Sequence, residues 1–466
     1  MIKPSEKFLT NWINLWVFVF CISVLSLNRH GGEAAIILLI TSAYLIFSSK
    51  SEKSKLKLTG NEIIFISLII LFLILNLITT IFQPIGIEFK NYRTILSSMD
   101  NPLRWLLMLP IFFLFKLFKL DWRFISIGLS LGVFISAGIA TYEVFVLGFS
   151  RATGGMNHPI AFGQLMVATD LLLWVFMIFA WNKDKKLLAT LLLISSLVAF
   201  YGSLLSVTRG AWLAYFFMIL TLVIYTVKKS LFSKNYFFSM PMLLRVLLAF
   251  VVFFLVSQTP QYNTIKDRSI ETVEYVKSKG QSNIWGSEGL RIDIFRTAIE
   301  MSRYFPFGVG TDNFQNGAKT LIILDALNNP NIEVRNENNQ KLDISDLNSD
   351  ILNHQFLQSS YKNMDAIRFT SMMDHAHNEW LNVLAENGVA GLILLTLIFA
   401  FPIKIFWQNL NHKNDLVGIY CYCGILHIGS FAIFGQTESI FSSHSVVIFF
   451  IFFLFLFIAQ ISKLTE

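Results

Sequence analysis

The chain has 466 residues, of which 54% are hydrophobic and 14% are charged, and its mean hydropathy of +0.59 is too high for a soluble fold of this length. The formal net charge of +7 would suggest a nucleic-acid partner in a soluble protein, but here the basic residues lie in short loops between apolar runs. Composition therefore excludes a soluble domain, argues against nucleic-acid binding, and indicates an all-α polytopic membrane protein surrounded by membrane lipids.

Apolar runs long enough to cross roughly 30 Å of hydrocarbon recur along almost the whole chain. They predict about twelve transmembrane helices. These helices are expected at 11–27, 33–48, 61–82, 101–118, 124–147, 160–181, 187–206, 210–227, 242–258, 388–407, 416–434 and 445–462. The predicted organisation is transmembrane helices 1 to 9 over residues 1–258, a cap loop over 259–379, and transmembrane helices 10 to 12 over 380–466.

The distribution of lysines predicts how these helices are oriented. Lysines gather in alternate loops, for example at 50–57 and 183–186, and such loops face the cytoplasm. Both chain termini are expected on that side. The opposite side then carries the loops 151–159 and 436–444 and a long insertion over 257–377. In a bacterial inner membrane, that opposite side is the periplasm.

The long insertion far exceeds the usual length of a loop, which predicts a functional segment. Apolar residues recur at helical spacing from Leu290 to Met301, before Pro306 ends the run. Two more amphipathic pieces cover 321–327 and 344–364. We therefore expect one large, mostly helical periplasmic loop that forms a small cap over the membrane helices.

Arg209 stands in the short turn Thr208-Arg209-Gly210, between two apolar runs with almost no loop between them. An arginine at a membrane boundary is costly unless it reaches water or has a partner. It could be a topological anchor, although the expected basic anchors lie on the other side. The alternative is an anion site, because a planar guanidinium can bind phosphate oxygens in a bidentate manner.

Two further arginines are expected on the same face. Arg291 lies near the start of the first cap helix, where it could pair with Glu288 as an ordinary solvated charge. Arg151 belongs to the glycine-containing segment 150–159, in which backbone N–H groups can approach an anion. Together with Arg209, these residues favour an anion-binding face.

Two histidines stand in the pentapeptide 374–378, directly before the tenth predicted helix. Because imidazole titrates near pH 6.5, His375 and His377 are candidates for general acid–base chemistry. They could instead be solvated residues beside a helix that Asn378 or Asp374 caps. A metal site is a third interpretation, but no further cysteine or closely spaced histidine completes a ligand set.

The order of these residues resembles a known family. His377-Asn378, followed after nine residues by Gly388-x-x-Gly391, is similar to the signature of bacterial O-antigen ligases. This family belongs to a superfamily that also contains O-antigen polymerases and O-linked protein oligosaccharyltransferases. The resemblance extends to the turn at Arg209, to the arginine-bearing cap helix with the segment 306–310 after it, and to the arrangement of about twelve membrane helices around one large loop.

The resemblance implies transfer of a glycan from undecaprenyl diphosphate to a sugar of the lipid A core, without nucleotide, metal or other cofactor. Arg209 and Arg291 would hold the diphosphate, whose negative charge grows as the sugar–phosphate bond breaks. His377 would accept the proton of the acceptor hydroxyl or orient that hydroxyl. Arg151, His375 and Asn378 would complete the substrate-binding groups. A single displacement from an α-linked donor would invert the anomeric centre.

Three other functions compete with an O-antigen ligase. An O-linked protein oligosaccharyltransferase would use the same donor with a serine or threonine acceptor, and an O-antigen polymerase would extend a lipid-linked glycan. A transporter also has about twelve spans, but transporters tend to contain repeated halves, which this sequence does not show. The sequence does not identify the acceptor.

Overall fold

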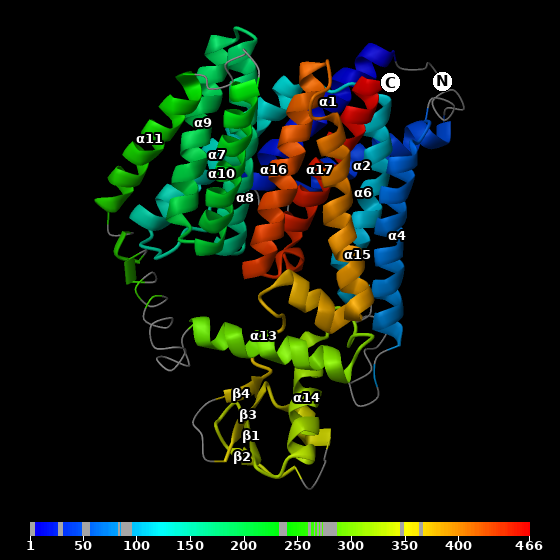
Figure 1. The fold of residues 1–466 in the computed structure, drawn as a ribbon, viewed down its shortest axis with the longest axis vertical. Coiled ribbons are helices and arrows are strands. Elements are labelled where there is room, and N and C mark those ends of the chain that lie inside the picture. Colours follow the sequence, from blue (N-terminus) through cyan, green and yellow to red (C-terminus); the bar gives the residue numbers. More distant parts are fainter. Residues whose placement is uncertain are drawn as a thin grey trace.

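The computed structural model describes most of the chain as a helix bundle with a smaller cap at one end (Figure 1). The described residues are 5–26, 31–48, 56–82, 84, 96–232, 240–259, 287–344, 349–362 and 367–466, together with scattered positions between 262 and 273. Most of the lysine-rich loop 50–57 and the side chain of Glu288, the expected partner of Arg291, therefore lie outside the described part.

A helix lies on each of the apolar ranges expected to cross the membrane. These helices are α1 (Glu6–Ser26), α2 (Gly31–Ser48), α4 (Gly60–Ile81), α6 (Asp100–Leu117), α7 (Trp122–Phe145), α8 (Pro159–Asn182), α9 (Lys186–Leu205), α10 (Arg209–Phe232), α11 (Met240–Ser257), α15 (Glu379–Asn409), α16 (Asp415–Thr437) and α17 (His444–Thr465). Among the described residues, eight helices are long and apolar enough to cross a membrane. The membrane class is thus confirmed, whereas the expected count of about twelve crossings is not.

Helices α8 and α17 form the centre of the bundle. The most apolar stretch of α8 is 100% buried and that of α17 is 94% buried, whereas α4 buries 39% of its stretch. Helices that are apolar on all sides can be enclosed by other helices, and those with one polar or lipid-facing side remain at the periphery. The candidate functional residues described below lie where the central helices begin, next to the cap.

Both chain ends lie at the end of the bundle opposite the cap (Figure 1). A buried ion pair lies at that end. Lys116 Nζ is 2.7 Å from Glu62 Oε2 and donates to Ser462 Oγ at 2.8 Å. All three side chains are buried, and together they join α6, α4 and α17. A buried charge persists when it is paired and hydrogen-bonded, which fixes the relative height of these helices.

Helix α15 has a sharp kink at Gly388, whose φ of 68° and ψ of −170° are not helical. The predicted span at 388–407 corresponds to the part of α15 after this kink. The kink frees two carbonyls of the first part, and the cap segment occupies both. The amide of Val309 donates to Ala385 O at 3.0 Å, and that of Gly310 donates to Glu386 O at 2.9 Å.

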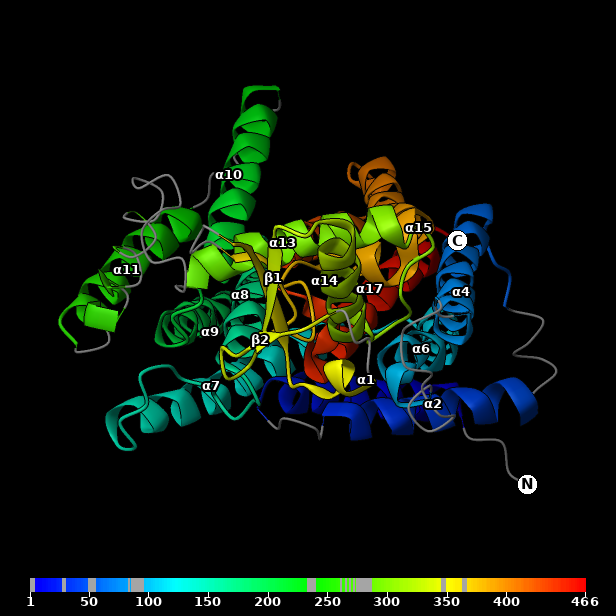
Figure 2. The same cartoon turned by 90° about the horizontal axis from the view of Figure 1, so that it is seen from below.

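The cap contains helices α13 (Ser287–Tyr304) and α14 (Phe314–Asn328) and a four-stranded antiparallel sheet. The strands are β1 (Ile332–Asn336), β2 (Lys341–Leu342), β3 (Leu357–Tyr361) and β4 (Ile367–Thr370), in the order β2-β1-β3-β4. Apolar residues of both helices and of the sheet form one separate core. Seen from below, the cap covers the middle of the bundle (Figure 2).

The sheet corrects one prediction for the cap. The first two amphipathic pieces are helices, as expected, but the third, at 344–364, is not. This range contains a short 3-10 turn at Ser349–Asn353 and the strand β3. Its periodicity was ambiguous because β3 pairs with β1, a segment more than twenty residues earlier, and pairing of this kind leaves no helical or local signal.

Candidate functional site

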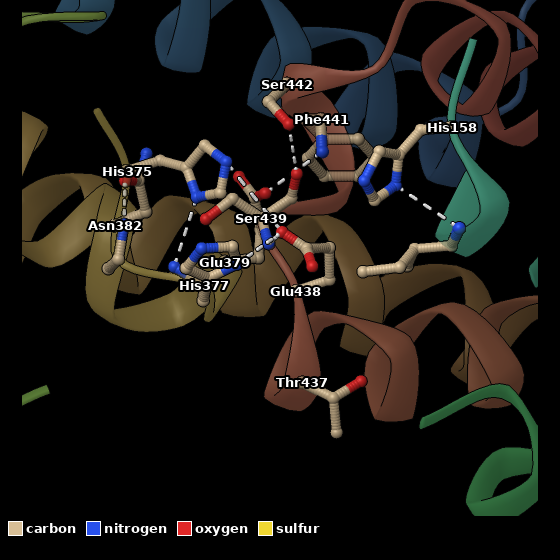
Figure 3. Close-up of polar contacts among 12 residues, drawn as sticks. His158, His375, His377, Glu379, Asn382, Thr437, Glu438, Ser439, Phe441 and Ser442 are labelled. Atoms are coloured by element: carbon tan, nitrogen blue, oxygen red, sulfur yellow. Dashed lines mark hydrogen bonds and ion pairs between the residues drawn. The ribbon is translucent and has the colours of Figure 1, made fainter. Parts of the chain in front are cut away.

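Three histidines and one glutamate gather at the cap-side end of the bundle. His375 and His377 come from the loop between β4 and α15, Glu438 directly follows α16, and His158 directly precedes α8. The rings of His375 and His377 meet edge to face, with centroids 4.3 Å apart. Figure 3 shows the two rings beside the Glu438 carboxylate, with His158 on the other side of the site.

The shortest contact in this group joins His377 to Glu438. The distance from His377 Nδ1 to Glu438 Oε1 is 2.9 Å. An ionised carboxylate can only accept hydrogen bonds, so the proton of the neutral imidazole must lie on Nδ1. Nε2 of His377 therefore has a free lone pair, which is the arrangement that a general base requires.

Several contacts of the loop hold the two histidines in place. Asn378 caps α15, because its Oδ1 accepts from the amide of Leu381 at 3.1 Å. Its Nδ2 donates to Gln436 O at 3.1 Å, two residues before Glu438. Asn378 thus ties the histidine loop to the glutamate loop. His377 itself has a φ of 48°, a strained value for a residue other than glycine.

The charges of the site shift one another's titration. Burial alone would raise the pKa of Glu438, but the hydrogen bond from His377 and the charges of His377, His375 and Arg291 lower it below its usual value. Burial lowers the pKa of His375, and repulsion from His377 lowers it further. Burial likewise lowers the pKa of His158, with a contribution from Arg151. At neutral pH the site therefore combines an ionised carboxylate with neutral His375 and His158.

A cavity of about 810 Å³ opens in front of these groups. We call it the imidazole cavity, because His158, His375, His377 and Glu438 line it together with residues of α2, α6, α8 and the start of α17. Glu438 Oε2 is buried and has no hydrogen-bond partner among the described residues. A buried acceptor without a partner favours a ligand that brings a donor.

Arg151 supports the turn that precedes Arg209. Its Nε donates to Ser206 O at 3.0 Å, and its Nη2 contacts Thr208 Oγ1 at 3.4 Å. In the glycine-containing segment 150–159, the backbone N–H groups already bind a carboxylate side chain of the same protein. Those of residues 153 and 154 donate to the Glu143 carboxylate at 2.6 and 2.8 Å.

The other two predicted arginines lie on different elements, α10 and α13. Arg209 is the first residue of α10, and a Cβ atom added to the next residue, Gly210, would overlap Thr437, the neighbour of Glu438. Arg291 lies on α13, close enough for its charge to lower the pKa of Glu438. All three arginines are half-buried. Among the described residues, none of the three lines the imidazole cavity itself.

The same groups could hold a metal ion by distance alone. His375, His377 and Glu438 each offer one ligand atom, and these atoms lie within 4.8 Å of one another. Glu438 thus supplies the third ligand that the sequence did not reveal. The hydrogen bonds disfavour this use, however. His375 Nδ1 accepts from the amide of His377 at 3.2 Å, so a neutral His375 carries its proton on Nε2, the atom nearest Glu438.

Sequence reasoning did not single out Glu438 or His158. Both lie in loops that the charge distribution placed on the face of the predicted site, but each is a lone polar residue at the edge of an apolar run. Glu438 is 61 residues from its partner His377. The one available signal was that helix ends on the same side of a bundle can lie close together. This signal predicts the side on which a partner lies, but it does not predict which residue is the partner.

The central part of the chain is similar to a known family. Residues 194–396 match the family model described as O-antigen ligase. This segment contains Arg209, Arg291 and His377. An uncharacterized protein of Haemophilus influenzae is 24% identical over 447 residues, which is 96% of this chain and 97% of that relative. The family match confirms the resemblance that the motifs indicated, over the part of the chain that contains them.

Proposed function

We propose that the protein transfers a glycan from undecaprenyl diphosphate to the lipid A core, since residues 194–396 match the family model described as O-antigen ligase. The reaction takes place at the periplasmic face of a bacterial inner membrane. The main support for this proposal is the hydrogen bond between His377 and Glu438 on the wall of the imidazole cavity. Its distance from Nδ1 to Oε1 is 2.9 Å.

In the proposed step, a hydroxyl of the acceptor sugar attacks the anomeric carbon of the donor. The new carbon–oxygen bond forms as the bond from that carbon to the phosphate oxygen breaks. Nε2 of His377 takes the hydroxyl proton, and Glu438 stabilises the resulting imidazolium through Nδ1. The lipid diphosphate leaves with the bonding electrons. A single displacement of this kind inverts the anomeric centre.

The arginines stabilise the leaving group. Negative charge grows on the diphosphate as the bond breaks, and guanidinium groups fixed beforehand stabilise it without reorganisation. Arg209 and Arg291 are placed on different elements, so a diphosphate between them would be held from two sides. Arg151 supports this arrangement by holding the turn before Arg209. The step as written needs no nucleotide and no metal.

The proposal includes a membrane orientation. All twelve bundle helices cross the membrane, the two chain ends face the cytoplasm, and the cap faces the periplasm. The position of both chain ends opposite the cap supports this orientation (Figure 1). A polyprenyl tail can then stay in lipid while its diphosphate reaches the cavity at the periplasmic end of the helices.

Purified protein in detergent tests the reaction directly. It should transfer glycan from a lipid-linked donor to a lipid A-core acceptor, and Arg209→Ala or Arg291→Ala should abolish transfer while the protein remains folded. Arg303→Ala is the matched control on α13, since Arg303 is 67% exposed and pairs with Glu300. Normal activity in either site variant would remove the diphosphate role of that arginine. Loss of activity with a chelator, restored by a divalent ion, would establish the metal site instead.

The acceptor is tested in the cell. Deletion of the gene should remove long-chain lipopolysaccharide from gels. Surviving long chains with a lost glycoprotein signal would establish an O-linked protein oligosaccharyltransferase, and shortened chains that are still attached would establish a polymerase. A transporter would show no transfer in detergent, because it has no chemical step to perform.

A further inference from the structure

A second cavity of about 290 Å³ adjoins the imidazole cavity, and the proposed step does not use it. We call it the acidic cavity. It lies between α4, α6, the first part of α15 and the turn after Gly310. The two cavities share wall residues, among them Asp100, Asn101 and His375. A molecule in the acidic cavity would therefore lie beside His375, which also lines the imidazole cavity.

The walls of the acidic cavity are rich in acceptor groups. They contain the carboxyl groups of Asp312, Asp374, Glu379 and Glu386, together with that of Asp100, which pairs with Arg104. His375 is the one basic side chain among its described wall residues. Clustered carboxylates repel a diphosphate, so the leaving group of the donor does not fit here. They accept hydrogen bonds from hydroxyl or ammonium groups, while Phe72, Trp105 and Phe441 provide apolar surface for the face of a ring.

Asn387 gives an independent indication of a ligand. Its side chain is on the wall of the acidic cavity and only 1% exposed. Its Nδ2 contacts Thr79 Oγ1 at 2.9 Å and Thr311 Oγ1 at 3.2 Å, which fixes the amide. Its Oδ1 has no hydrogen-bond partner among the described residues. A fixed, buried acceptor of this kind needs a donor, and a sugar hydroxyl supplies one.

From this geometry we infer that the acidic cavity binds the acceptor sugar, and that this sugar is neutral or amino-bearing rather than a sugar acid. The inference rests on the proposed function. In a single displacement, the attacking hydroxyl approaches opposite the leaving group. With the diphosphate at the arginines and the donor sugar in the imidazole cavity, the acidic cavity is left for the acceptor. Its carboxylates exclude a sugar that carries a carboxylate of its own.

Kinetics of the purified protein test this assignment. The double variant Asp312→Asn with Glu386→Gln keeps side-chain size, and asparagine tolerates the φ of 57° at residue 312. We expect the KM for the acceptor to rise about tenfold, with the KM for the donor unchanged, because uniform binding of one substrate is lost. Glu333→Gln on the cap sheet, outside both cavities, is the control. A raised donor KM with an unchanged acceptor KM would assign the cavity to the donor glycan and overturn the inference.

A binding measurement separates this inference from the proposed function. Saturation-transfer NMR on the detergent-solubilised protein should detect free glucose and glucosamine but not glucuronate. Asn387→Leu should abolish both signals, as should the double variant if the leucine variant does not fold. These signals do not depend on catalysis, so a protein that fails to transfer glycan can still show them. Equal binding of glucuronate, or sugar signals that survive in the variants, would refute the acceptor site.

Discussion

At the level of single residues, the role of Glu438 as the positioning residue of His377 can be tested by removing the charge of Glu438. In Glu438→Gln the amide oxygen can still accept from Nδ1, but the negative charge is gone. We expect kcat/KM to fall roughly 10- to 100-fold, because the imidazolium formed in the reaction loses its counter-ion.

The fall of the wild-type rate at acid pH should not come from protonation of Glu438 itself. The pKa of Glu438 is lowered by His377, His375 and Arg291 against the effect of burial, so the carboxylate persists as pH falls through the usual range for glutamate. The cap offers a matched control in a second pair of the same kind, His354 and Glu337, 3.3 Å apart. Glu337→Gln should leave the rate and profile unchanged. An unchanged kcat/KM in Glu438→Gln would show that the charge of Glu438 does not act on the base.

Residue types and spacing predicted one half of the proposed site. The pentapeptide at 374–378 and the turn at Arg209 were recognisable because several polar residues stand together beside apolar runs. Glu438 was not recognisable, since its function depends on a partner that folding brings from 61 residues away. The capping role of Asn378 was one of two alternatives, and the contact with Leu381 decides between them.

At the level of elements, the junction between the cap and α15 should depend on two glycines. A Cβ atom added to Gly388 would overlap the carbonyl oxygen of Pro306, and one added to Gly308 would overlap that of Glu386. Both residues also have positive φ values, 68° and 88°. Gly388→Ala and Gly308→Ala should each cost about 1–3 kcal/mol or more and reduce transfer, because the histidine loop is continuous with this junction.

Thermal midpoints in detergent provide the measurement. Gly138→Ala in α7 is the matched control, because its added Cβ would meet nothing within 4 Å. That change should leave stability equal or raise it by roughly 0.5–1 kcal/mol, since alanine favours a helix. Midpoints that fall equally in all three variants would show that the close approach at the junction is not the cause.

Helix α13 should make stability depend on pH. Burial raises the pKa of Asp293 to about 6, against the attraction of Arg296. A folded-state pKa above the unfolded value means that the folded protein binds the proton more tightly. Asp293 therefore has no effect on the free energy of unfolding below about pH 4. It lowers that free energy increasingly between about pH 4 and about pH 6, and by a constant amount at higher pH.

Asp293→Asn should remove this penalty. The variant should match the wild type near pH 4 and have a higher thermal midpoint at pH 7, in scans at a fixed rate. Asp184→Asn is the control, because the side chain of Asp184 is 90% exposed. If the variant and the wild type have equal midpoints at pH 7 as well as at pH 4, the carboxyl group is not desolvated as its position on α13 implies.

The elements themselves were predictable to different degrees. The membrane helices followed from apolar length alone, and each has its helix within a few residues of the expected range, apart from α15. There the polar first turns before Gly388 hid the helix, because they carry site residues instead of a lipid-facing surface. The cap sheet was missed because its strands are short and pair over long separations, which a local pattern does not record.

At the level of the whole molecule, the peripheral helix α11 is fastened to the bundle by a buried charge cluster. Arg245 Nη2 lies 2.6 Å from Asp170 Oδ2, and Arg245 Nε donates to Ser196 Oγ at 2.7 Å. The hydroxyl of Tyr215 also accepts a hydrogen bond from Arg245. The cluster therefore links α11 to α8, α9 and α10. Hydropathy placed Arg245 within a span but gave no partner for it, because the partners lie on three other helices.

Removal of one charge of this pair should destabilise the bundle far more than removal of both. Arg245→Met leaves Asp170 buried without its counter-ion, which should cost about 3–5 kcal/mol. Adding Asp170→Leu should restore most of that loss, because well-packed apolar residues can replace a buried ion pair. Thermal midpoints in detergent would measure both changes. A double variant as unstable as the single one would mean that Arg245 acts through its packing against Trp174 and Phe200, whose rings lie 5.0 and 5.5 Å from its guanidinium carbon.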